Sequence, residues 1–108
     1  MVVNTIVSLG DGQLAAAKGT LYTVPASTHT LIKVIKLVNT SASLTETIRL
    51  YVLPSGAGTS RLIHRFILAP NESAEVTDVY LGTATGLLQG DSTDATTVDY
   101  SIHGVESV

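Results

Sequence analysis

Three histidines are the side chains of this sequence best suited to binding a metal. His29, His64 and His103 are its imidazoles, and a stable site needs three or four ligands that converge on the ion. The histidines fall on different expected strands, and none forms a His-x-His pair. His64 and His103 could meet across a sheet beside a carboxylate such as Glu75, but ordinary surface histidines explain the pattern more simply. We therefore expect no metal site.

The carboxylates and hydroxyls lack the spacing of a catalytic site. Residues 90–94 (GDSTD) resemble part of a calcium loop but lack its further oxygen donors, so an Asx-type turn is favoured. Glu72, Glu75 and Asp78 do not share one face of a strand, which predicts a solvated edge and not a general acid–base pair. Residues 55–58 (SGAG) have neither the context of a nucleophile elbow nor the ending of a phosphate-binding loop. These patterns predict a protein that is not an enzyme and has no cofactor.

Composition limits the partners. The chain has 108 residues, no Cys and a net charge of −3, with its six basic residues scattered; this pattern argues against a nucleic-acid partner. No apolar run is long enough to cross a membrane, and no signal peptide is evident. Only 14% of the residues are charged, against about a quarter in a typical domain. We expect other subunits to cover part of the surface.

Short runs of β-branched and aromatic residues, interrupted by Gly, Pro, Asn and Ser, are typical of strands and turns. The clearest is 44–53, which alternates apolar and polar residues except at Glu46. The other expected strands are 2–8, 20–24, 30–39, 61–68, 74–81, 87–89 and a last one from 97 nearly to the C-terminus. Only 13–18 resembles a helix, of at most a turn or two.

About eight short antiparallel strands predict an all-β, two-sheet sandwich of the jelly-roll kind, or a small barrel. We expect a single domain over 1–108, with 1–19 as an N-terminal arm or edge strand. Two strands, 30–39 and 61–68, are apolar on both faces, so one face of each would meet a neighbouring subunit. The candidate interface residues are Leu31, Lys33, Ile35, Leu37, Ile63, Arg65 and Ile67.

A second candidate contact lies in the loop after the strand 44–53. Gly56 and Gly58 leave its backbone unconstrained, and exposed loops often carry binding residues. We expect the loop to contact a partner through Ser55, Gly56, Gly58 and Thr59.

Several short segments, taken in order, resemble small virion proteins of tailed bacteriophages. They are 22–27 (YTVPAS), 39–41 (NTS), 51–56 (YVLPSG), 68–72 (LAPNE), 87–91 (LLQGD) and 102–106 (IHGVE). The similarity covers nearly all of the chain from Thr20 onward. Asn71 stands where a Gly is expected, and Asn is compatible with a left-handed turn position. The resemblance implies a β-sandwich unit on a capsid or in a tail.

Within this family, the compact chain favours a capsid decoration (cement) protein. Such a protein would bind across subunits of the phage major capsid protein, as a homo-oligomer for which a trimer is favoured. It would be made in the host bacterial cytoplasm, in agreement with the lack of Cys, and would reside in the virion. The alternative is a receptor- or glycan-binding module of a tail or fibre. Sugar sites often use exposed aromatic rings, and this chain has four Tyr, one Phe and no Trp.

Overall fold

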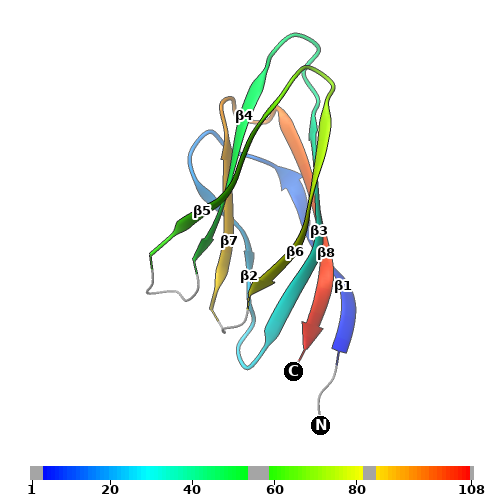
Figure 1. The fold of residues 1–108 in the computed structure, drawn as a ribbon, viewed down its shortest axis with the longest axis vertical. Coiled ribbons are helices and arrows are strands. Elements are labelled where there is room, and N and C mark those ends of the chain that lie inside the picture. Colours follow the sequence, from blue (N-terminus) through cyan, green and yellow to red (C-terminus); the bar gives the residue numbers. More distant parts are fainter. Residues whose placement is uncertain (1–3, 54–58, 82–84, 108) are drawn as a thin grey trace.

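The computed structural model describes residues 4–53, 59–81 and 85–107, which form eight β-strands in two layers (Figure 1). No helix occurs in these ranges, and so none that could cross a membrane. The strands are β1 (Asn4–Gln13), β2 (Gly19–Thr23), β3 (His29–Asn39), β4 (Glu46–Leu53), β5 (Arg61–Leu68), β6 (Ser73–Leu81), β7 (Leu87–Ser92) and β8 (Val98–Ser107).

The strands form two antiparallel four-stranded sheets. Sheet A has the order β1-β8-β3-β6, and sheet B has the order β2-β7-β4-β5. The first strand pairs with the last, the second with the seventh, the third with the sixth and the fourth with the fifth. The chain is thus one long hairpin rolled into two layers, which is the jelly-roll arrangement. The expected all-β sandwich is confirmed.

The inner faces of the two sheets meet in one apolar core, to which Ile32, Ile35, Leu37, Ile48 and Leu50 contribute fully buried side chains. On β3 the side chains that point into the core are at even positions up to Ile32 and at odd positions from Ile35 onward. Its pairing with β8 skips Lys33, which forms a β-bulge between Ile32 and Val34. A bulge inserts one extra residue, so Ile32 and Ile35 both point inward although they are three positions apart, a spacing that puts residues of a regular strand on opposite faces.

The side chain of buried Asn39 connects the end of β3 by hydrogen bonds to the segment before β4 and to the end of β5. Its Nδ2 donates to the carbonyl oxygens of Leu44 and Leu68 at 2.8 and 3.1 Å. The nearby turn between β5 and β6 contains Asn71 with φ of 62°, so the left-handed conformation anticipated for this Asn is confirmed. The side chain of Glu72 closes the turn by accepting a hydrogen bond from the Ala69 amide at 2.9 Å.

Two local expectations were wrong. Residues 14–18 contain no helix, because Leu14 is buried and its amide donates to the Val98 carbonyl oxygen, which fixes this segment against β8. Leu44 was expected to be the first residue of the strand 44–53. The strand begins only at Glu46, and Leu44 is 47% exposed.

Candidate binding surface

The outer face of sheet A carries a line of apolar side chains that crosses all four strands. Ile6 of β1 is paired with Val105 of β8. Val105 is in turn paired with Leu31 of β3, and Leu31 with Tyr80 of β6. Directly opposed residues of neighbouring strands project to the same side of a sheet. We call these four residues the apolar row: Ile6, Val105, Leu31 and Tyr80.

The two ends of the apolar row are strongly exposed. Ile6 is 87% and Tyr80 63% exposed, whereas Leu31 and Val105 are half-buried. The Tyr80 hydroxyl lies 3.4 Å from Nδ1 of His29, and most of the side chain remains exposed. Isolated apolar side chains are normal on a protein surface, but a contiguous line of them is typical of a binding site.

Polar side chains become more frequent on the outer face of sheet A with increasing distance from the apolar row. The next line of paired residues is Ser8, His103, Val34 and Thr77, and the one beyond it is Asp11, Ser101, Lys36 and Glu75. Lys33 at the bulge forms an exposed ion pair with Asp78, with Nζ 3.1 Å from Oδ1. The outer face of sheet A therefore combines an apolar end with a polar end.

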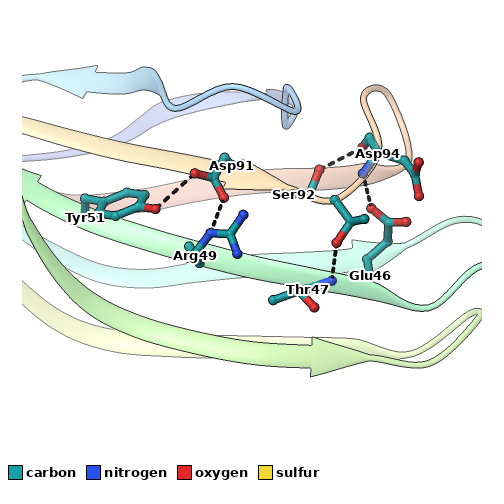
Figure 2. Close-up of polar contacts among 8 residues, drawn as sticks. Glu46, Thr47, Arg49, Tyr51, Asp91, Ser92 and Asp94 are labelled. Carbon is teal, nitrogen blue, oxygen red and sulfur yellow. Dashed lines mark hydrogen bonds and ion pairs between the residues drawn. The ribbon is translucent and has the colours of Figure 1, made fainter.

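The outer face of sheet B is polar over β4 and β7, and side chains of these two strands bind one another (Figure 2). Asp91 of β7 is nearly buried; it accepts hydrogen bonds from Arg49 Nε at 2.9 Å and from the Tyr51 hydroxyl at 3.0 Å. Burial, followed by these interactions with Asp91, raises the pKa of Tyr51. The Lys18 ammonium lies over the Tyr51 ring, 4.6 Å from its centroid. The side chains of Asp91, Arg49, Tyr51 and Lys18 thus satisfy and cover one another.

A second buried acid lies at the start of β4, near the other end of Figure 2. Glu46 Oε1 accepts a hydrogen bond from the Asp94 amide at 2.8 Å, but buried Oε2 has no hydrogen-bond partner within the described part of the chain. Burial, and then the neighbouring Asp94 carboxyl, raise the pKa of Glu46. Glu46 occupies the inward phase of the strand, which is why it interrupted the alternation of apolar and polar residues in the sequence.

The run 90–94 is only partly a turn. Residues through Ser92 belong to β7, and the Asp91 side chain points to Arg49 and Tyr51. The turn begins after Ser92, whose hydroxyl donates to the Asp94 carbonyl oxygen at 2.8 Å. The described residues contain no group of three His, Cys, Asp or Glu side chains that could hold a metal ion. His64 and His103, which were weighed as joint ligands, lie on different sheets.

The structure divides the candidate interface residues of β3. Leu31 and Lys33 lie on the outer face, as the interface hypothesis requires. Ile35 and Leu37 are fully buried in the core of the chain itself, so the expectation that they share an outward face with Leu31 is wrong. The cause is the bulge at Lys33, which reverses the phase of the strand.

The candidate residues of β5 are exposed. Ile63 is 36% exposed, Ile67 is 61% exposed, and Leu62 on the same strand is 49% exposed. Arg65 is also exposed, and its direct partner across the ladder is Arg49. The strand is an edge of sheet B, so it leaves one side of its backbone ladder open. Whether these residues form an interface stays a prediction.

The expected contact loop falls mostly in residues 54–58. Ser55, Gly56 and Gly58 lie outside the described residues, and Thr59 is exposed just before β5. Ile6, Val105 and Tyr80 are binding candidates that sequence reasoning missed. None of the three stands out in the sequence, where Ile6 and Tyr80 lie among neighbouring apolar residues and Val105 stands alone. Their alignment with Leu31 depends on the pairing of strands distant in the chain.

No family model matches the chain, and no curated protein matches it. Solved structures do resemble it. A chain of the Bacillus endospore appendages, described as disulfide-linked pili, is 18% identical with a TM-score of 0.54; the match covers 97% of this chain and 86% of that one. A chain of the T13 IBDV viral particle is 8% identical with a TM-score of 0.58; the match covers 99% of this chain but only 30% of that one.

A weaker match is the Clostridium thermocellum xylanase 10B CBM22-1-GH10 structure, complexed with xylohexaose. It is 16% identical with a TM-score of 0.46, and the match covers 99% of this chain and 24% of that one. At these identities the similarities show the fold alone. This β-sandwich fold thus occurs in a chain of a pilus and in a chain of a viral particle.

Proposed function

We propose that this domain is a structural protein of a bacteriophage virion, a decoration (cement) protein that binds across subunits of the major capsid protein. The observation that carries the proposal is the apolar row, with Ile6 87% and Tyr80 63% exposed at its ends. A jelly-roll domain in a viral particle and the resemblance of the ordered segments to phage virion proteins support it. The protein acts by binding, as a homotrimer, without catalysis.

The binding energy would come mainly from the apolar row. Burial of one large apolar side chain contributes about 1.5–3 kcal/mol, and a few such anchors commonly dominate an interface. The row extends across the whole sheet, so it can contact more than one capsid subunit. A ligand that binds only the assembled shell stabilises that shell by mass action. Because the contact is apolar, its strength should depend only weakly on salt.

The alternative function is a receptor- or glycan-binding module of a tail or fibre. An exposed aromatic ring is the usual platform for a sugar. Tyr80 is the most exposed of the tyrosines, whereas Tyr22 is buried and the Tyr51 ring is covered by Lys18. The described residues form no pocket around Tyr80. A single open tyrosine supports a flat protein contact better than a sugar site.

The proposal is tested with phage particles that lack this protein. We expect such particles to assemble and to adsorb to their host normally, but to release DNA at a lower temperature than complete particles. Addition of purified protein should restore heat resistance in a saturable way, with little change when ionic strength is raised. Particles that lose adsorption while keeping normal heat resistance would instead support the tail-module alternative.

A further inference from the structure

The two edge strands β5 and β6 carry opposite charges. β5 contains Arg61 and Arg65 with no acidic residue, whereas β6 contains Glu75 and Asp78 with no basic residue. Glu72 adds a third negative charge in the turn before β6. No ion pair joins Arg61 or Arg65 to an acid among the described residues. These two guanidinium groups are therefore available to an outside partner.

The topology places the oppositely charged edges together. β1 and β2, the other two edge strands, contact each other across the sandwich. This leaves β5 and β6 at the opposite side, joined by the turn 69–72 (Figure 1). Consecutive strands joined by so short a turn run in opposite directions. Rotating a second copy about an axis parallel to the strands leaves all strand directions unchanged. The β6 strand of the second copy can therefore lie antiparallel to β5 of the first.

We propose that β5 of one copy pairs with β6 of a second copy, and that this contact builds the homo-oligomer. Arg65 and Glu75 both project from the outer faces of their sheets, as their ladder partners Arg49 and Lys36 do. Edge-to-edge pairing makes those two faces continuous, so Arg65 lies beside Glu75 of the neighbouring copy. Exposed Leu62 and Ile67 of β5 add apolar contact with the same edge.

Charge decides between this contact and its main competitor, the pairing of β5 with β5. Two copies of β5 would bring Arg61, Arg65 and their counterparts together, and like charges across a ladder are unfavourable. Arg49, the ladder partner of Arg65 within the chain, is ion-paired with Asp91, so the excess positive charge of this edge belongs to Arg61 and Arg65. The acidic β6 edge relieves this repulsion. Because β5 and β6 are different edges, the contact is heterologous, and it generates a closed ring when the rotation between copies closes.

The inference deepens the oligomeric part of the proposed function and is tested on purified protein without particles. Three variants are compared with the wild type by sedimentation over a range of concentrations: Arg65→Glu, Glu75→Arg and the double variant. Each single reversal should weaken association at least about tenfold. The double variant should recover it, because the pair is restored with its charges exchanged. Asp11→Arg on β1, at the opposite edge of sheet A, is the matched control and should associate normally.

The outcomes separate the competing arrangements. If β5 paired with β5, Glu75→Arg would have no effect and the double variant would behave like Arg65→Glu; either result overturns the inference. A wild type that stays monomeric at high concentration also overturns it. Thermal unfolding confirms that each variant is folded, and Arg61→Glu provides a second charge reversal on β5. The particle assay above reports on the proposed function separately, since monomers can still be tested for protection of the shell.

Discussion

On the outer face of sheet B, Asp91 holds Arg49 and Tyr51, and Lys18 covers the Tyr51 ring. On the outer face of sheet A, the apolar row ends in Ile6 and Tyr80, which are 87% and 63% exposed. Both faces belong to one sandwich with one core, so the fold does not require this difference. The comparison teaches that sheet B is covered by its own side chains over β4 and β7, whereas the outer face of sheet A retains a surface suited to a partner.

The largest effect is expected from a change that breaks the geometry behind the apolar row. Gly104 of β8 lies against the bulge of β3, and a Cβ atom there would collide with the Leu31 carbonyl oxygen. Backbone atoms cannot move aside cheaply, so Gly104→Ala should lower the free energy of unfolding by about 2–4 kcal/mol. Chemical denaturation measures the change. Gly19→Ala is the control, because the nearest atom to its new methyl group would be 3.9 Å away.

A smaller loss is expected on sheet B when its central acid is neutralised. Asp91→Asn removes the charge that holds Arg49 and leaves Arg49 opposite Arg65 without compensation. The expected loss is about 2 kcal/mol, in the range of hydrogen bonds between charged groups. The exposed Asp99 accepts one hydrogen bond from Gln13, and Asp99→Asn should change stability by less than about 0.5 kcal/mol. Equal losses in the two variants would contradict the role given to Asp91.

Glu46→Gln tests the other buried acid of this sheet and should be stabilising at neutral pH. The folded state raises the pKa of Glu46 above its ordinary value of 4.5. The folded chain thus holds this proton more tightly than the unfolded chain. The resulting stability is fully present below pH 4.5 and is lost as pH rises through the higher folded pKa. The variant lacks this loss, so its free energy of unfolding at neutral pH should be about 1 kcal/mol higher than that of the wild type.

The pH dependence of unfolding measures this effect directly. The curves of wild type and Glu46→Gln should converge in acid and separate as pH rises. Parallel curves for Glu46→Gln would mean that Glu46 is not held in its protonated form by the fold.

The sequence predicted the sandwich because local patterns determine strands. Alternation and turn residues located all eight, including β5 at its observed bounds. The patterns failed where geometry depends on distant pairing. The bulge at Lys33 exists only in the ladder with β8, so the inward direction of Ile35 and Leu37 could not be inferred from alternation. The apolar row likewise depends on how four strands pair with one another. Its members Ile6 and Val105 are neighbours on the sheet although they lie far apart in the sequence.

The central claim is that the apolar row binds the particle, and a binding assay with decoration-free capsids tests it most directly. Ile6→Ser and Tyr80→Ser are at exposed positions and should change the free energy of unfolding by less than about 0.5 kcal/mol. We expect the double variant to lose saturable binding to the capsids, with an apparent Kd at least about a hundredfold weaker. The matched control, Thr20→Ser on the exposed part of sheet B, should bind as the wild type does. Wild-type affinity in the folded double variant would contradict the claim.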